Sequence, residues 1–146
     1  MEKPVIIKGG LAVDDRGEVG FVNDFQFTRV KRFYTVRNHS KGFVRAWHGH
    51  RKEKKYFTAV TGTFLVCLVK IDDWENPSPN LAVERYLLSA KQPAVLAVPT
   101  GYANGTMALT DDAVLMVFSS KGLQESLQDD IRFASRYWDP WNVEER

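Results

Sequence analysis

Two of the three histidines in this chain form the sequence His48-Gly49-His50 at the end of a strand-like stretch. Residues i and i+2 of an extended segment point to the same face, so both imidazoles can enter one cavity. Imidazole is a general base near neutral pH and a common ligand of zinc, iron and copper. The pair therefore indicates a proton-transfer site or a metal site; the simpler alternative is two half-exposed histidines at a strand end.

The glycines around this pair extend it into a longer motif. It resembles the first metal motif of the cupins, which are small β-barrels, and a second cupin-like motif follows later in the chain. The resemblance implies an all-β fold, a cupin jelly-roll β-barrel. The residues that carry it are Gly42, His48, His50 and Gly62 in the first motif and Pro99, Gly101 and Asn104 in the second.

Two metal-ligand positions of these motifs hold other residues. Counting back from Gly62, Lys55 stands where the cupins have a glutamate, and Asn104 stands where they have a histidine. An ammonium group has no lone pair, and the asparagine amide is a poor ligand beside imidazole. We therefore expect no metal and no other cofactor. Glu53, two positions out of register, leaves a weaker metal site as an alternative.

A cupin with a cation in that place resembles the nucleotide-sugar epimerases and isomerases typified by dTDP-4-dehydrorhamnose 3,5-epimerase. The resemblance runs from Asp15 to about Trp141. It implies that Lys55 is the active-site lysine and that Arg16 and Arg45 contact the nucleotide pyrophosphate, which suits a bidentate guanidinium. The motifs are Asp15-Arg16-Gly17, Asn38-His39-Ser40, Val44 to His48, Leu88-Ser89-Ala90, Ala97 to Gly105, and Trp138-Asp139-Pro140.

A sister branch, the dTDP-sugar 3,4-ketoisomerases, is similar to other segments. Arg45 to Arg51 and Glu125 to Arg132 resemble its motifs, and it has a histidine at the position of His50, where the epimerases usually have glutamine. Lys55 and the segment 99–105 favour the epimerases. We therefore expect an epimerase acting at C3, C5 or both of a nucleotide-linked 4-keto-6-deoxy sugar, in deoxysugar and polysaccharide biosynthesis. The alternatives are a 3,4-ketoisomerase and a non-catalytic sugar-nucleotide-binding cupin.

These residue types suit the removal of a hydrogen next to a ketone, which needs a base and a group that stabilises the enolate oxygen. His48 is the expected base. Asp139 is the first candidate for a carboxylate behind its imidazole, with Asp129 and Asp130 as alternatives. The Lys55 ammonium would face the ketone oxygen, unless it is a surface lysine. The expected catalytic residues are His48, His50, Lys55 and Asp139.

The second acid of the epimerases is missing from its usual position. The proton-donating tyrosine of that family aligns with Val117, and its nucleobase-stacking tyrosine aligns with Leu123. Either another tyrosine replaces the acid, or the enzyme works from one face of the sugar only. The candidate tyrosines are Tyr34, Tyr56 and Tyr102, and the expected substrate-binding residues are Arg16, Arg45, Trp47, Tyr102 and Asn104.

The elements that must position these residues are short, β-rich segments separated by turns. Ten Gly and six Pro are spread along the chain, a pattern that favours a barrel or sandwich. One late helix is expected from Ser126 to Tyr137, because Leu127, Ile131 and Ala134 share one side of it. The expected strands are Val5–Ile7, Val19–Val22, Arg32–Val36, Lys55–Val60, Thr63–Ile71, Ala82–Leu88, Ala94–Val98 and Ala113–Phe118.

Length and composition fit a single cupin-like domain, residues 1–146, with 44% hydrophobic and 26% charged residues. Lys and Arg total 20 against 18 Asp and Glu, and this net charge of +2 does not favour nucleic acid as a partner. Cys67 is the only cysteine, which excludes an internal disulfide and a cysteine-based zinc site.

The remaining expectations concern location and assembly. The N-terminus lacks a signal-peptide pattern, and no apolar run reaches membrane-spanning length. We therefore expect a cytoplasmic protein that binds a small nucleotide-sugar substrate and no membrane. We also expect a homodimer, because a barrel of this size leaves strand edges to cover and the similar proteins pair their N-terminal strands.

Overall fold

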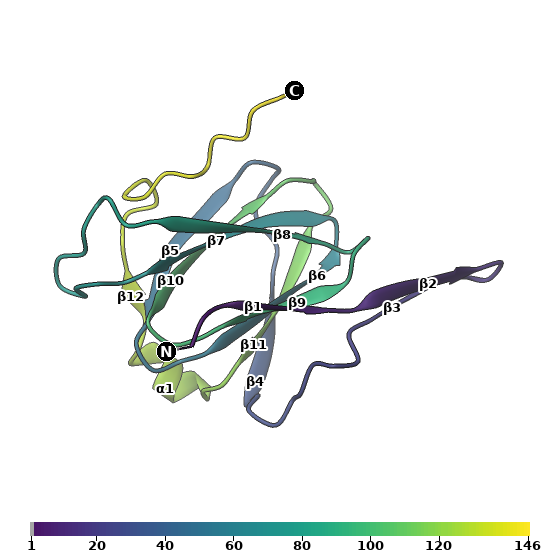
Figure 1. Cartoon of the computed structure of the whole chain (residues 1–146), viewed down its shortest axis with the longest axis horizontal. Helices are drawn as coiled ribbons and strands as arrows, with labels where there is room; N and C mark the ends of the chain where they lie inside the picture. Colours follow the sequence, from purple (N-terminus) through teal and green to yellow (C-terminus); the bar gives the residue numbers. More distant parts are fainter. Residues whose placement is uncertain (1) are drawn as a thin grey trace.

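The computed structural model describes residues 2–146, which form two five-stranded antiparallel sheets packed face to face (Figure 1). A two-stranded hairpin extends away from these sheets, and the described range contains one short helix near its C-terminal end. This architecture confirms the predicted all-β class with a short helical segment. No helix within residues 2–146 has the length and apolar character needed to cross a membrane.

Sheet 1 has a buried inner face and a largely exposed outer face. Phe57, Leu115 and Val117 point inward, into the core shared with the other sheet. Phe33, on the outer face, is 64% exposed. This alternation along the strands is typical of a sheet with one covered face. The strand order is β1 (Val5–Lys8), β9 (Ala94–Val98), β6 (Lys55–Thr61), β11 (Val114–Ser119) and β4 (Arg32–Val36).

Sheet 2 is covered on both faces. Its β7 strand is buried continuously from Phe64 to Val69. Phe64 lies in the core between the sheets, whereas its neighbour Leu65 lies in a second core on the outer side. A continuous apolar run is what a strand with two covered faces requires. The strand order is β12 (Ile131–Arg132), β5 (Val44–His50), β10 (Tyr102–Ala108), β7 (Thr63–Lys70) and β8 (Val83–Ser89).

The C-terminal helix is shorter than the sequence predicts. Helix α1 spans Leu123–Leu127, whereas the apolar spacing predicts a helix that continues to Tyr137. Beyond α1 the chain forms β12, which pairs with β5. The backbones of Phe133 and Trp47 also exchange two hydrogen bonds, at 3.1 and 3.2 Å. The prediction was wrong for this segment because its backbone hydrogen bonds complete the edge of sheet 2.

The C-terminal segment covers the outer face of sheet 2 with aromatic side chains. Trp138 and Trp141 pack against Trp47, with ring centroids 5.5 and 5.2 Å from it. The Trp47 indole donates a hydrogen bond to the Trp138 carbonyl at 3.1 Å, and the Trp138 indole donates to the Ser78 carbonyl at 3.0 Å. These contacts form the second core and explain why β7 is apolar on both of its faces.

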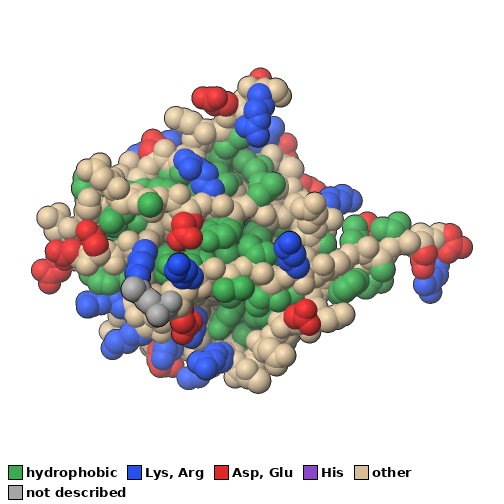
Figure 2. All heavy atoms as spheres, in the orientation of Figure 1, with side chains coloured by type: hydrophobic (Ala, Val, Ile, Leu, Met, Phe, Trp, Pro, Cys, Tyr) green, Lys and Arg blue, Asp and Glu red, His purple; other side chains and the backbone are tan. Residues whose placement is uncertain are grey.

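The hairpin stands away from the barrel and exposes apolar side chains. Its strands β2 (Gly10–Asp14) and β3 (Gly17–Phe21) pair antiparallel, and all of β3 is exposed. Val13 and Val19 are 70% and 64% exposed. Figure 2 shows hydrophobic side chains along this hairpin and over the middle of the adjoining face of the barrel. A hairpin of this length is marginally stable by itself and needs a packing partner.

Replacing Trp138 by alanine tests the second core. The change removes ring contacts with Trp47, Phe133 and Tyr137, and we expect the unfolding free energy to fall by about 3–5 kcal/mol. Denaturant unfolding followed by fluorescence measures it. The control is Val143→Ala, at an exposed position of the same segment, which should change stability by less than about 0.5 kcal/mol. Equal stability of the two variants would contradict a packed second core.

Candidate active site

Strand β5 presents its polar side chains to the space between the sheets through an irregularity at Trp47. Its register with β10 skips from His48 to Ala46 and leaves Trp47 without a partner. This one-residue bulge brings Arg45 to the same face as His48 and His50. Trp47 is fully buried in the second core. This corrects its prediction as a substrate contact, because the indole packs on the opposite face of sheet 2 from the space between the sheets.

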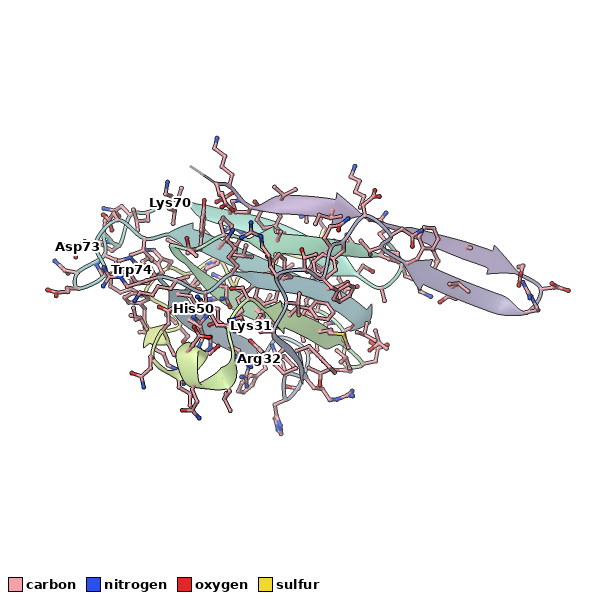
Figure 3. All side chains as sticks on the ribbon, turned by 90° about the horizontal axis from the view of Figure 1, so that it is seen from below. Lys31, Arg32, His50, Lys70, Asp73 and Trp74 are labelled. Atoms are coloured by element: carbon pink, nitrogen blue, oxygen red, sulfur yellow. The ribbon has the colours of Figure 1, made fainter. Side chains whose placement is uncertain are left out.

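A cavity of about 260 Å³ lies between the two sheets, at the end of the molecule closest to α1. His50 and Arg32 can be located at this end in Figure 3. Sheet 2 contributes Arg45, His48, His50, Asn104, Thr106 and Arg132; sheet 1 contributes Arg32, Tyr34, Val36, Lys55, Phe57, Leu115 and Val117; α1 and the loops contribute Glu53, Leu123, Ser126, Leu127 and Asp130.

His50 is held in one tautomer. Its Nδ1 lies 2.7 Å from the backbone carbonyl oxygen of Asp129, and because a carbonyl only accepts, Nδ1 carries the hydrogen. Nε2 is then the basic nitrogen. Burial lowers the pKa of His50 below its ordinary value of 6.5, partly opposed by the Asp129 hydrogen bond. His50 is therefore a neutral imidazole with a free basic nitrogen at pH 7.

His48 is more exposed and has a carboxylate beside it. Its Nδ1 lies 3.8 Å from Oδ1 of Asp130, and the other oxygen of that carboxylate accepts from Arg132 at 3.0 Å. Burial is the main cause that lowers the pKa of His48; the charge of Arg132 also lowers it, whereas Asp130 raises it. His48 is thus a neutral imidazole whose protonated form Asp130 can stabilise.

Asp139, the predicted partner of His48, lies elsewhere. Its carboxylate is on the surface, where it accepts from Arg136 at 2.9 Å. The chain reaches this position only after turning outward to cover sheet 2, so Asp130 takes the place beside His48. The remaining candidate, Asp129, accepts three backbone N–H groups from residues 51–53 at 2.8–2.9 Å and holds that loop in place.

Lys55 is a buried cation of the cavity wall and not a surface lysine. Its Nζ lies 2.7 Å from the Tyr34 hydroxyl and 3.2 Å from Oε2 of Glu53. Glu53 is fully buried and accepts hydrogen bonds from the hydroxyls of Ser119 and Ser126. Burial acts to raise the pKa of Glu53, but the two hydroxyls and the charge of Lys55 outweigh it and hold that pKa below its usual value.

Tyr34 is the candidate tyrosine that lines the cavity. It pairs with Val117 in the register of β4 and β11, so both side chains share the inner face of sheet 1. A hydroxyl therefore stands one strand away from the valine that occupies the family's acid position. Tyr56 instead packs against Phe25, 5.4 Å away between ring centroids. Tyr102 is buried in the core between the sheets, outside the cavity lining, which corrects its prediction as a substrate contact.

The other predicted substrate contacts divide into two groups. Arg45 and Asn104 line the cavity, and the Asn104 amide also donates to the His48 carbonyl at 3.2 Å. Arg16 lies in the turn of the β2–β3 hairpin, where it pairs with Asp14. Because this hairpin points away from the barrel, Arg16 does not line the cavity of its own chain (Figure 1).

Sequence reasoning assigned no role to Arg32 or Arg132 and treated Glu53 only as a weak metal ligand. Arg32 lies 3.6 Å from Glu53, and Arg132 pairs opposite His48 in β12. Alternation along β4 places Arg32 on the same face as Tyr34, which was a usable signal. The two-residue β12 is too short to carry such a pattern.

The donor atoms of His50, Glu53 and Asp129 lie within 4.8 Å of one another, but their chemistry does not suit a divalent metal. The Nδ1 hydrogen of His50 points to a carbonyl, and the Asp129 carboxylate already accepts three N–H groups. The Lys55 ammonium, 3.2 Å from Glu53, would repel a cation. Within the described residues this cluster serves hydrogen bonding and charge pairing.

The cavity carries a net positive charge. Its lining contains four permanent cations, counting Lys and Arg, and two carboxylates, while both histidines are neutral. An apolar wall from sheet 1 faces these groups, formed by Val36, Phe57, Leu115 and Val117. Such a cavity can bind an anionic molecule with arginine, exclude water from its apolar part and transfer protons through imidazole.

Residues 5–139 match the protein family described as FdtA: WxcM-like, C-terminal, and the chain therefore belongs to this family. No curated protein sequence matches it significantly.

Solved structures share the fold at low sequence identity. The dTDP-4-dehydrorhamnose 3,5-epimerase of Bacillus anthracis, with TDP and PPi bound, has a TM-score of 0.76 at 18% identity, covering 97% of this chain and 86% of its own. The RmlC epimerase of Mycobacterium tuberculosis has a TM-score of 0.73 at 23% identity, covering 94% and 71%. The 3,4-ketoisomerase QdtA of Thermoanaerobacterium thermosaccharolyticum, a histidine-to-asparagine mutant with TDP-4-keto-6-deoxyglucose, has a TM-score of 0.70 at 22% identity, covering 95% and 94%. These similarities confirm the predicted cupin fold and include both branches that the sequence resembles.

The charges of Arg132 and Asp130 should shift the pKa of His48 in opposite directions, which NMR titration can test. NMR titration should give a pKa below 6.5 for His48. The variant Arg132→Gln should raise that pKa, because a nearby positive charge disfavours the imidazolium, and Asp130→Asn should lower it further. A His48 pKa that is the same in all three proteins would show that the Arg132–Asp130 pair does not face the imidazole.

Proposed function

We propose that this protein is an isomerase that epimerises a nucleotide-linked 4-keto-6-deoxy sugar at C3, C5 or both, in deoxysugar and polysaccharide biosynthesis. One observation carries the proposal: proton-transfer groups face a single cavity from two opposed sheets. His48 and His50 come from sheet 2, and Tyr34 and Lys55 come from sheet 1. Inversion at a carbon next to a ketone needs a base on one side of the sugar and an acid on the other.

His48 is the proposed base. With Asp130 beside Nδ1, the opposite nitrogen, Nε2, is free to take the proton from the carbon next to the ketone. The imidazolium that forms is then stabilised by the carboxylate. The lowered pKa of His48 keeps it neutral at pH 7, the form in which it can accept a proton.

Tyr34 is the proposed acid for the opposite face. Lys55 donates a hydrogen bond to its phenol oxygen, so the phenol hydrogen is free to be given elsewhere. The same ammonium would stabilise the phenolate left after proton delivery, and it can stabilise negative charge on the ketone oxygen. In this proposal Tyr34 replaces the tyrosine that the similar epimerases have at the position of Val117.

The proposed substrate places its sugar between the sheets and its nucleotide at the opening. A cavity of about 260 Å³ is small for a whole nucleotide sugar but suits one sugar ring. Arg45 and Arg132, both exposed, are positioned to bind the pyrophosphate. The TDP, PPi and TDP-sugar ligands of the structural neighbours support a substrate of this class.

The chain also has features of a 3,4-ketoisomerase, which is the second candidate function. His50 shares the inner face of β5 with His48 and has a free Nε2, so two bases stand on one wall. A 3,4-ketoisomerase moves a proton along one face of the sugar, so it needs basic groups on one side of the cavity only. The nearly full-length match to QdtA, covering 94% of that protein, supports the same alternative. A non-catalytic sugar-nucleotide-binding protein is the third.

The proposal includes no metal and no cofactor, because Lys55 and Asn104 stand at cupin ligand positions and cannot replace the missing ligands. It treats residues 1–146 as one cupin-like domain that acts in the cytoplasm. Neither nucleic acid nor a membrane is a partner in it.

Incubation with dTDP-4-keto-6-deoxyglucose in deuterated water separates the candidates. Deuterium at C3, C5 or both, with inversion, supports the epimerase; exchange at C3 with a 3-keto product supports the ketoisomerase; no exchange supports binding only. His48→Asn should lower turnover about 100-fold or more, and Tyr34→Phe should permit exchange while losing inversion. The control is His39→Asn, at an exposed histidine outside the cavity. If the His48→Asn variant retained most of the wild-type turnover, the proposed mechanism would be refuted.

We further propose that the protein is a homodimer in which the β2–β3 hairpin packs on a second copy. The hairpin exposes Val13 and Val19 and has too few contacts to be stable alone. Two exposed aromatic side chains also lie at the outer face of sheet 1: Phe33 of β4, and Phe27 of the loop before β4, which packs against Phe118. If Arg16 contacts the pyrophosphate, as the family resemblance implies, it does so in the cavity of the partner, because its own cavity is out of reach.

Charged substitutions on the hairpin test this assembly. Val13→Lys/Val19→Lys should give a folded monomer by light scattering at micromolar concentration, since both apolar contacts are lost. Arg16→Gln should leave the dimer intact and weaken dTDP binding. Val143→Lys, at an exposed apolar position of the C-terminal segment, is the matched control and should remain dimeric. A wild-type monomer at this concentration would refute the dimer.

A further inference from the structure

One buried carboxylate of the cavity has no role in the proposed chemistry. Glu53 follows β5 and precedes β6 in the chain, and its side chain has no exposed surface. Its Oε2 accepts from the hydroxyls of Ser119 and Ser126 and lies 3.2 Å from Nζ of Lys55. Its Oε1 has no hydrogen-bond partner and lies 3.3 Å from Nδ1 of His50. One carboxylate therefore faces a proton-transfer group from each sheet.

We propose that Glu53 is a positioning residue that links the two walls of the cavity. Its Oε1 stabilises the protonated form of His50, and its Oε2 holds the Lys55 ammonium against the hydroxyl of Tyr34. This inference rests on the proposed function and adds a second histidine–carboxylate pair to it, beside that of His48 and Asp130.

The fixed tautomer of His50 keeps a hydrogen on Nδ1, the nitrogen that faces Asp129 and Glu53. When Nε2 takes a proton, the Nδ1–H group lies between the Asp129 carbonyl at 2.7 Å and Glu53 Oε1 at 3.3 Å. A carboxylate at that distance favours the positive form. Lys55 opposes it, and Asp129 favours it. The other titratable neighbours of His50 are His48 and Asp130.

The Lys55 ammonium needs a counter-charge to stay in its buried position. Lys55 has a side chain only 6% exposed, and its ammonium contacts Glu53 and Tyr34. A buried cation with a phenol as its single partner is strongly disfavoured and would reorient toward solvent or substrate phosphate. The carboxylate of Glu53 keeps Nζ in place, so that its hydrogen bond to Tyr34 is retained while the sugar binds.

A purely structural role for Glu53 makes a different forecast. As a counter-ion for Lys55 and for Arg32, 3.6 Å away, Glu53 would matter for folding alone. Its loss would then lower the melting temperature and leave the activity per folded molecule unchanged. The positioning role requires that this activity falls and that the pKa of His50 falls with it.

The titration of His50 is the first test, and it needs no substrate. In Glu53→Gln, NMR should give a lower pKa for His50 than in the wild type, because a negative charge that favours the imidazolium is lost. Glu53→Asp keeps the charge and should restore most of the shift. If Glu53→Gln folds poorly, the pKa of His50 is compared between Arg32→Gln and the double variant Arg32→Gln/Glu53→Gln. The double variant removes one positive and one negative charge, so it leaves no unpaired buried charge at this pair. An unchanged His50 pKa in these pairs would overturn the proposal.

Turnover is the second test. Glu53→Gln should lower kcat by roughly 10- to 100-fold, the range for a residue that acts through another, and change KM by less than about threefold. The matched control is Glu75→Gln, the same chemical change at an exposed position. Full activity of Glu53→Gln beside an active wild type would refute the positioning role. A wild type that catalyses no exchange would instead refute the proposed function, whatever the titration of His50 gives.

Discussion

The bulge at Trp47 is the constraint on which the site depends. Side chains along a strand alternate between its faces, so an unbroken β5 would put Arg45 and His48 on opposite sides of sheet 2. Trp47, which has no partner in β10, changes that alternation and brings Arg45 to the cavity with both histidines. Because sheet 2 is covered on both faces, a slip of one residue would move the charged side chains into the second core and the aromatic ones into the space between the sheets. The second core and the active site therefore specify the same register.

The parts of the site that lie on regular strands were predictable. The period of two placed His48 and His50 together, and the spacing to Gly62 identified Lys55 as a cavity residue. Strand β10 was missed because Asn104 and Gly105 at its centre are poor strand formers. Tertiary packing requires glycine at position 105. A Cβ on it would lie 2.7 Å from the Ala46 side chain and 2.8 Å from the ring of Trp141.

The errors near the C-terminus share one cause. The spacing of Leu127, Ile131 and Ala134 fits a helical face, but the backbone beyond α1 instead pairs with an open edge of sheet 2. Local periodicity cannot report that such an edge is available. The same pairing brings Asp130 to His48 and carries Asp139 away to the surface, so one unseen strand changed both the secondary structure and the expected histidine partner.

The pairing of charges in the cavity bears on both its stability and its ability to bind an anion. The most deeply buried charges, Lys55 and Glu53, lie 3.2 Å apart, and two serine hydroxyls complete the environment of the carboxylate. Buried charges persist only when paired and hydrogen-bonded in this way. Of the other lining cations, Arg132 pairs with Asp130 at 3.0 Å, Arg32 lies 3.6 Å from Glu53, and Arg45 is exposed. If the substrate is a nucleotide sugar, as proposed, the exposed arginines can turn toward its diphosphate while the buried groups stay preorganised.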